Sequence, residues 1–228
     1  MYLLNNIKRL IGTFNPIQLA LFRQVLLTKI NLTQTELDRL DSLITSMKAR
    51  TKPEEFSNGS DLRWHCLKNE DRDYFSTLFH RLCSEVDCKP EEFEFFVMYN
   101  ETLYTPDGTG SGNGWHFDST FHQRKFIFYL SDVGRENGPF EYVPSTYSLP
   151  FIRSLLIKNI FTKDILRYQE IGELENDVKQ ILGNKGSGYF ISTSLLHRGA
   201  PVDKGFRKAL TFYMFKRNKV SANFKRYI

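Results

Sequence analysis

The chain has 228 residues, of which 41% are hydrophobic and 25% charged, a balance typical of a globular domain. Its net charge is +5, and its three cysteines form no C-x-x-C pair, which argues against a disulfide framework and a thiolate zinc site. No apolar run approaches the roughly 18 residues of a membrane span, and the first residues do not resemble a signal peptide. We therefore expect a cytoplasmic protein with one domain over residues 1–228.

Residues 1–92 are expected to be mostly helical and to support the rest of the chain. In residues 32–47 the apolar side chains recur at steps of three and four, which places them on one helix face: Leu37, Leu40, Ile44 and Met47. Thr33 and Glu36 have the spacing of a capping box at the start of this helix. Residues 70–86 repeat the helical pattern with Phe75, Leu78, Phe79, Leu82 and Val86.

The pattern changes near residue 93. Aromatic and β-branched segments without helical period predict strands at 92–104, 115–117, 124–133, 140–144, 188–192, 195–199 and 206–216. Helices are predicted at 148–161 and at 174–183, where Gly183 suits a helix C-cap. Short strands behind a helical start indicate a mainly β fold with flanking α-helices. Residues 93–217 form the expected core, and 218–228 a basic tail.

The stretch Gly114-Trp115-His116-Phe117-Asp118 follows a glycine-rich loop, TPDGTGSGN. In a strand, residues i and i+2 point to the same side, so His116 and Asp118 aim an imidazole and a carboxylate at one point. Both groups are ligands for a borderline metal. An H-x-D pair alone arises often by chance, and its alternative is a set of hydrogen-bonded polar side chains. The loop at 105–114 is a candidate lid or an ordinary connection.

A third ligand candidate is His197, 79 residues beyond Asp118 at a predicted strand end. Two histidines and one carboxylate on one face of a metal leave positions open, as in non-haem Fe(II) oxygenases, whereas a structural zinc site closes with four protein ligands. Arg207 follows ten residues later on the next strand, and its planar fork suits a carboxylate. The alternative for Arg207 is a surface cation in a basic segment.

These motifs together resemble a known family. WHFD, YLSDVGRENGPFEYVPSTYS and GSGYFISTSLLHRGAP, with Arg207 after them, are similar to the phytanoyl-CoA dioxygenase-like family of Fe(II)/2-oxoglutarate oxygenases, over about residues 93–217. The chain departs from the family at Pro144-Ser145-Thr146-Tyr147, where the family has Pro-Gly-Ser-His. It departs again at Ser187-Gly188-Tyr189, where the family has a Gly-Asp pair.

The resemblance implies a double-stranded β-helix, a cupin-like jelly-roll core with an N-terminal helical support. It implies that His116, Asp118 and His197 hold Fe(II) and that Arg207 holds the far carboxylate of 2-oxoglutarate. The implied activity couples decarboxylation of 2-oxoglutarate with O₂ to hydroxylation of a small molecule. Asp118 disfavours halogenation, because halogenating relatives have a small residue there. Further 2-oxoglutarate contacts are open, and the candidates are Tyr99, Asn113, Lys125 and Thr211.

Three other classes of function remain open from the sequence. One is an inactive family member, and another is a zinc hydrolase. The third is an anion- or nucleic-acid-binding module, because the chain from Arg198 to its end has nine Lys or Arg against one acid, Asp203. We expect no nucleic-acid partner, because much of that segment is predicted strand whose aromatic side chains face the core. The basic region favours an anionic small-molecule substrate, and the oligomeric state is not encoded in a readable pattern.

Overall fold

The computed structural model describes residues 2–12, 27–66, 71–112, 114–118, 123–158, 160–161 and 167–217. The α-helices are α1 (Tyr2–Gly12), α3 (Gln34–Arg50), α4 (Arg72–Glu85) and α5 (Leu149–Lys158). The 3-10 segments are η1 (Ser57–Gly59), η2 (Pro90–Glu92), η3 (Arg135–Asn137), η4 (Pro144–Thr146) and η5 (Gly172–Asp177). No helix in these ranges has the length and apolar character needed to cross a membrane.

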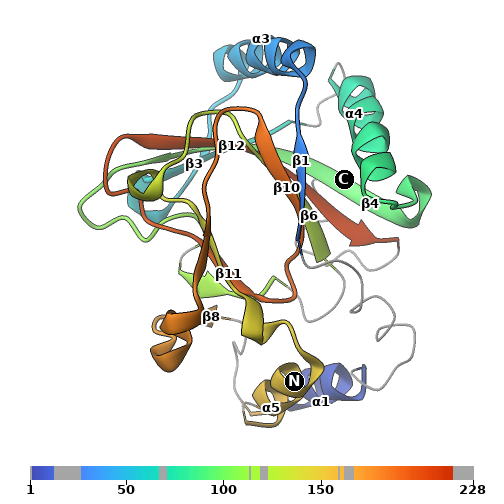
Figure 1. The fold of residues 1–228 in the computed structure, drawn as a ribbon, viewed down its shortest axis with the longest axis vertical. Helices are drawn as coiled ribbons and strands as arrows, with labels where there is room; N and C mark the ends of the chain where they lie inside the picture. Colours follow the sequence, from blue (N-terminus) through green and yellow to red (C-terminus); the bar gives the residue numbers. More distant parts are fainter. Residues whose placement is uncertain are drawn as a thin grey trace.

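Two antiparallel sheets form a β-sandwich of the cupin-like kind (Figure 1). The larger sheet has the order β1-β10-β6-β12-β4-β3-β2, with strands β1 (Leu27–Asn31), β2 (Glu54–Phe56), β3 (Asp61–His65), β4 (Phe93–Leu103), β6 (Gln123–Tyr129), β10 (Ser187–Ser192) and β12 (Phe206–Lys216). The smaller sheet has the order β8-β5-β11-β7-β9, with strands β5 (Trp115–His116), β7 (Phe140–Val143), β8 (Arg167–Tyr168), β9 (Lys179–Ile181) and β11 (Leu196–Gly199).

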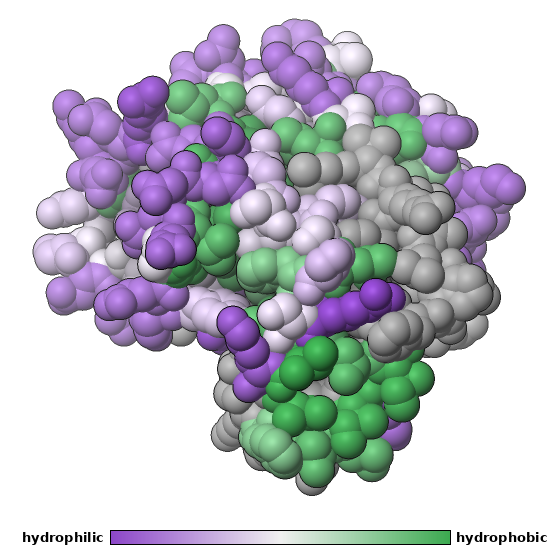
Figure 2. All heavy atoms as spheres, turned by 60° about the horizontal axis from the view of Figure 1, so that its bottom comes forward, coloured by the Kyte–Doolittle hydropathy of each residue, from purple (hydrophilic) through white to green (hydrophobic). Residues whose placement is uncertain are grey.

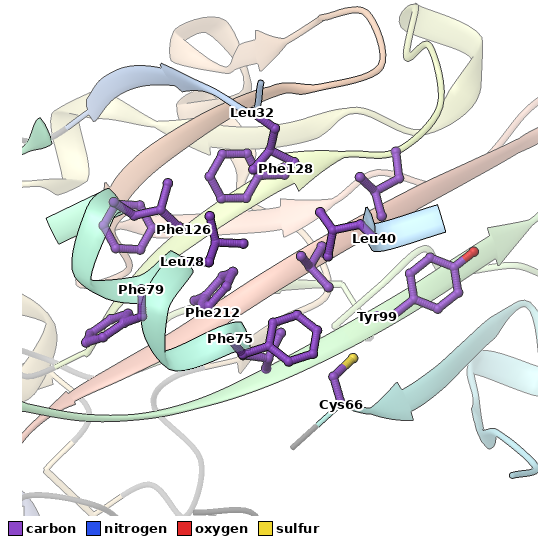
Figure 3. Close-up of a cluster of buried hydrophobic side chains, with 14 of the residues drawn as sticks. Leu32, Leu40, Cys66, Phe75, Leu78, Phe79, Tyr99, Phe126, Phe128 and Phe212 are labelled. Carbon is purple, nitrogen blue, oxygen red and sulfur yellow. The ribbon is translucent and has the colours of Figure 1, made fainter. Parts of the chain in front are cut away.

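The larger sheet buries one face under α3 and α4. Side chains of both helices pack there against alternate residues of β6 and β12, such as Phe126, Phe128 and Phe212 (Figure 3). Because side chains alternate across a strand, Arg207 and Thr211 of β12 point the other way, into the space between the sheets. The helix-covered core therefore fixes which residues of the sheet face the interior of the sandwich.

The smaller sheet carries α5 and α1 on its outer face, where Ile152 and Leu156 of α5 and Leu10 of α1 pack around Trp115. The far side of these helices is left exposed, and Figure 2 shows it as an apolar lobe. Its exposed large side chains are Leu3, Leu4, Ile11, Ile157 and Phe161. This packing supports β5, which carries His116, and β11, which carries His197.

The helices predicted near residues 34–47 and 72–85 are confirmed. Leu37, Leu40, Ile44 and Met47 are the buried residues of α3, and both hydrogen bonds of the Thr33–Glu36 capping box are present. The N-terminal part is less helical than expected, because β1, β2 and β3 join the larger sheet. These strands are short and mixed in composition, so their pairing with β10 and β4 decides their conformation.

The helix predicted at 174–183 is wrong. Leu174, Val178 and Ile181 recur at helical steps, but residues 172–177 form a 3-10 segment and 179–181 form strand β9. Strand β9 pairs with β7 at the sheet edge, which supplies backbone hydrogen bonds that a helix would supply locally. Gly183 is not a C-cap, because it forms a β-bridge with Val133. A Cβ there would lie 2.1 Å from the Ser187 hydroxyl oxygen.

Candidate metal centre

Strand pairing brings together the three residues of the expected metal site. His116 ends β5 and His197 lies in β11, and the two are direct partners in the antiparallel register. Their ring centroids are 4.4 Å apart. Asp118 follows β5 by two residues and turns its carboxylate toward both rings. Residues far apart in sequence therefore converge because β5 and β11 are neighbours in the smaller sheet.

The spacing of the three side chains suits a single metal ion. Asp118 Oδ1 lies 3.5 Å from His116 Nε2, and Asp118 Oδ2 lies 3.4 Å from His197 Nε2. One ligand atom from each residue lies within 4.8 Å of the others. Ligands at bonds of about 2.1 Å and right angles are about 3 Å apart, so the two distances from Asp118 to the histidines are close to those around a metal ion. All three residues line one cavity, which gives space for further ligands of a metal ion.

Backbone contacts orient both imidazoles for metal binding. Nδ1 of His116 lies 2.8 Å from the Gly114 carbonyl oxygen, and Nδ1 of His197 lies 2.9 Å from that of Leu195. A carbonyl oxygen only accepts, so each Nδ1 carries the proton and each Nε2 offers its lone pair toward Asp118. Nε2 of His197, at 1% residue exposure, has no hydrogen-bond partner among the described residues. A buried acceptor without a donor is costly, and a metal ion would satisfy it.

Electrostatics favour the protonation states that a metal needs. Burial opposes the ionisation of Asp118, but the Lys125 ammonium, 2.6 Å away, outweighs it and holds the pKa of Asp118 well below its usual range. Burial, with the neighbouring His116, lowers the pKa of His197 to about 4, against the opposing pull of Asp118. Near neutral pH the site therefore presents an ionised carboxylate and a neutral His197 imidazole.

The metal-free protein is expected to lose stability as pH falls from about 6.5 toward 4. An unfolded His197 takes up a proton near pH 6.5, whereas the folded one does so only near 4, so protons favour the unfolded chain in this window. At about 1.4 kcal/mol per pKa unit the loss approaches about 3 kcal/mol. Urea unfolding with a chelator at several pH values measures it. His197→Asn should flatten the slope and His80→Asn, at an exposed site, should not.

The glycine-rich loop packs closely against His116. Gly112 has φ +88°, and a Cβ there would lie 2.3 Å from Cε1 of the His116 ring. Gly114 has φ +89°, but the nearest atom to its Cβ would be the Tyr168 carbonyl oxygen at 3.5 Å. Both positions favour glycine through backbone conformation, and only the first also needs it for space beside the candidate ligand. The described part of the loop is tied down by Gly199 N donating to Ser111 O.

This pair of glycines gives a matched prediction. Alanine at either position should cost about 1–2 kcal/mol of folding free energy, because both adopt the left-handed region. Gly112→Ala should also displace His116 and lower the affinity for divalent metal by about tenfold or more, whereas Gly114→Ala keeps the carbonyl oxygen that orients His116 and should lower the affinity less. Thermal unfolding and calorimetric titration with Ni(II) check both effects. Equal metal affinities in the two variants would show that the close contact at Gly112 does not position His116.

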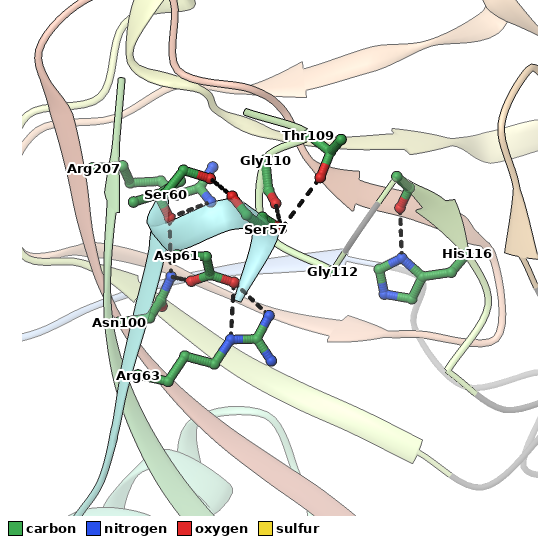
Figure 4. A network of polar contacts seen from close by, with 12 residues as sticks. Ser57, Ser60, Asp61, Arg63, Asn100, Thr109, Gly110, Gly112, His116 and Arg207 are labelled. Carbon is green, nitrogen blue, oxygen red and sulfur yellow. Dashed lines mark hydrogen bonds and ion pairs between the residues drawn. The ribbon is translucent and has the colours of Figure 1, made fainter. Parts of the chain in front are cut away.

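Arg207 is buried in the same cavity, with 3% exposure. Its Nη2 donates to the Thr102 hydroxyl oxygen at 3.1 Å, and its Nη1 has no hydrogen-bond partner among the described residues. Gly199 makes room for it, because a Cβ there would lie 2.6 Å from Nη2. A buried guanidinium with an unused donor is a site for an anionic ligand. Figure 4 shows Arg207 beside the polar network around Asp61.

One cavity of about 160 Å³ joins Arg207 to the candidate metal ligands. Lys125 and Thr211 line it too, as two of the open 2-oxoglutarate contacts would require. Tyr99 does not line the cavity. It lies in the helix-covered core, where its hydroxyl donates a hydrogen bond to Glu101, so the suggested contact between Tyr99 and 2-oxoglutarate is wrong. Asn113 lies outside the described residues, as does His122.

This cavity is also lined by two arginines that were not predicted from the sequence, Arg63 of β3 and Arg167 of β8. Arg63 donates through Nε to Asp61 at 2.9 Å, and Asn100 Nδ2 lies 3.4 Å from the other Asp61 oxygen (Figure 4). Arg167 donates to the Gly112 carbonyl oxygen at 2.8 Å. The alternation of Asp61 and Arg63 in DLRWH is a period-two signal that would have placed both on one strand face.

No family model matches the sequence, and no curated protein matches it. Solved structures do. AviO1 from Streptomyces viridochromogenes Tue57 is 18% identical with a TM-score of 0.58, covering 90% of this chain and 96% of that one. HygX from Streptomyces hygroscopicus, solved with nickel, 2-oxoglutarate and hygromycin B, is 12% identical with a TM-score of 0.55, over 93% and 94%.

A third similar structure is SnoN, described as a non-haem α-ketoglutarate-dependent epimerase from nogalamycin biosynthesis. It is 14% identical with a TM-score of 0.60, over 86% of this chain and 81% of that one. Identities this low concern the fold, and the fold match extends over nearly the whole chain. The chain therefore has the fold of non-haem, 2-oxoglutarate-dependent enzymes, with a His-Asp-His group inside it.

Proposed function

We propose that this chain is a non-haem Fe(II)- and 2-oxoglutarate-dependent oxygenase of the phytanoyl-CoA dioxygenase-like kind, acting as one domain with a double-stranded β-helix core. The observation that carries the proposal is the combination in one cavity of a three-residue ligand group and a buried arginine with an unused donor. A structural zinc site would close with a fourth protein ligand, and among the described residues the group has three.

In this proposal both histidines, His116 and His197, hold the metal through Nε2, and Asp118 holds it through a carboxylate oxygen. Arg207 binds the far carboxylate of 2-oxoglutarate, with Thr102 fixing one side of its fork. The bound Fe(II), 2-oxoglutarate and O₂ supply the oxidising chemistry, with succinate and CO₂ as co-products. The chain contributes fixed ligands, a fixed guanidinium and a cavity enclosed between two sheets. We propose hydroxylation of a small molecule as the outcome.

Two aromatic residues of the C-terminal strand β12 are too buried for base stacking, although Phe206 at its start is exposed. Phe212 and Phe215 of β12 are buried, which removes them as platforms for nucleic-acid bases. The basic tail at 218–228 lies outside the described residues.

The test is anaerobic. Metal-free protein receives Fe(II) and then 2-oxoglutarate, and the visible charge-transfer absorbance of the chelate is recorded. We expect an absorbance band that depends on both additions, followed by succinate formation when O₂ is admitted. The control replaces Fe(II) with Zn(II), which should give neither the absorbance band nor succinate. A protein that binds Fe(II) but shows no band with 2-oxoglutarate would refute the proposal and favour a hydrolytic or binding role.

A further inference from the structure

Lys125 is a buried cation to which the proposed function assigns no ligand of its own. It lies on β6, with 7% exposure, and lines the same cavity as the candidate metal ligands. Its Nζ lies 2.6 Å from Asp118 Oδ2 and 4.6 Å from the centroid of the Tyr213 ring. Tyr213 stacks in turn on Phe96, with centroids 4.5 Å apart. The ammonium is therefore held in place between a carboxylate and a supported aromatic face.

The charges of the loaded cavity do not balance without another anion. Arg63 is paired with Asp61, and Arg207 would be paired with the far carboxylate of 2-oxoglutarate. A divalent metal would be neutralised by Asp118 and the near carboxylate of 2-oxoglutarate. Arg167 is exposed, so solvent screens it. Lys125 then remains as a buried cation whose only acidic partner, among the described residues, is committed to the metal.

A buried cation without a counter-charge is strongly unfavourable, so a ligand that brings a negative charge is favoured at this position. Resting on the proposed function, we propose that Lys125 anchors an anionic group of the primary substrate, a carboxylate or a phosphate. The anchor adjoins Asp118, so the substrate is held beside the metal ligands. Arg63 and Arg167 line the same cavity and extend its positive potential.

The competing role for Lys125 is to bind the 2-oxoglutarate carboxylate nearest the metal. That role predicts weaker 2-oxoglutarate binding when the ammonium is removed. The substrate-anchor role predicts 2-oxoglutarate binding within about threefold of wild type and a loss of anion preference at the remaining ligand site. The two roles are therefore separated by measuring the two ligands independently on the same complex.

The experiment uses the anaerobic Fe(II)–2-oxoglutarate complex of the full chain, titrated with two matched pairs of probes, benzoate with benzamide and acetate with acetamide. The readout is the concentration at which each probe perturbs the visible band. Wild type should respond to each carboxylate at concentrations about tenfold or more below those of its amide, as expected for one charge-assisted hydrogen bond. Lys125→Met should lose this preference, and Lys125→Arg should retain most of it.

Lys208→Met is the matched control, because it removes a cation from the neighbouring strand β12 on the opposite sheet face, where Lys208 lies 4.0 Å from Glu101. It should behave as wild type. Thermal unfolding of the metal-loaded variants shows that each is folded. Equal responses to acid and amide in wild type, an unchanged preference in Lys125→Met, or a tenfold weaker 2-oxoglutarate affinity in that variant would each overturn the inference. Absence of the band in wild type would instead overturn the proposed function, and the inference with it.

Discussion

Asp118→Ala is expected to abolish the Fe(II)–2-oxoglutarate absorbance and to lower divalent-metal affinity by at least about 100-fold. Asp118 is the anionic member of the three-residue group, and its two oxygens face the two imidazole Nε2 atoms at 3.5 and 3.4 Å. Removing one charge from a buried cation site typically costs about 3–5 kcal/mol, which is more than a factor of 100. Calorimetric titration with Ni(II) and the anaerobic spectrum measure the two effects.

Asp118→Asn is the graded comparison, because it keeps an oxygen ligand and removes the charge. It should bind metal more weakly than wild type and more tightly than Asp118→Ala. Asp132→Ala is the control, because Asp132 accepts a hydrogen bond from the Lys185 backbone at an exposed turn. If Asp118→Ala kept wild-type metal affinity, the three-residue group would not be the metal site.

Arg207→Ala is expected to raise the dissociation constant for 2-oxoglutarate by about 100-fold and to leave metal affinity within about threefold of wild type. The guanidinium is buried and has an unused Nη1 donor, so it would contribute two charge-assisted hydrogen bonds to a carboxylate. Losing one partner of such a pair costs about 2–5 kcal/mol. Titration of the visible band with 2-oxoglutarate gives the constant.

Two comparisons make this second prediction specific. Wild type should prefer 2-oxoglutarate over 2-oxobutyrate, which lacks the far carboxylate, and Arg207→Ala should lose most of that preference. Lys208→Ala alters the next residue of β12, whose side chain lies on the other sheet face near Glu101, and should change neither value. A retained preference in Arg207→Ala would assign the far carboxylate to another cation of the cavity.

Local sequence pattern was sufficient for the long elements. The strands predicted at 92–104 and 206–216 are confirmed as β4 and β12, and the predicted helix with the Thr33–Glu36 box is α3. Such elements carry their own signal, because many side chains share one period and the ends have capping chemistry. Residues 174–183, wrongly predicted as a helix, also have helical spacing, but residues 179–181 form strand β9 because they pair with β7.

The sequence also nominated the four residues of the candidate site. His116 and Asp118 stand out through their i, i+2 spacing, and His197 and Arg207 through their order behind it. Their convergence in one cavity is a finding of the structure, and their roles as ligands remain a proposal. Residue types, their order and the family resemblance therefore pointed to the proposed chemistry before any contact was known.

Only the tertiary structure decided how these residues act on one another. The register that sets His197 opposite His116 and the contact of Lys125 with Asp118 each join segments that local pattern leaves independent. The physical reason is that strand register depends on how the whole sandwich packs, whereas side-chain periodicity reports only which face of its own strand a residue occupies. The sequence by itself determined the candidate residues and the long strands, and long-range pairing determined how the candidate site is assembled.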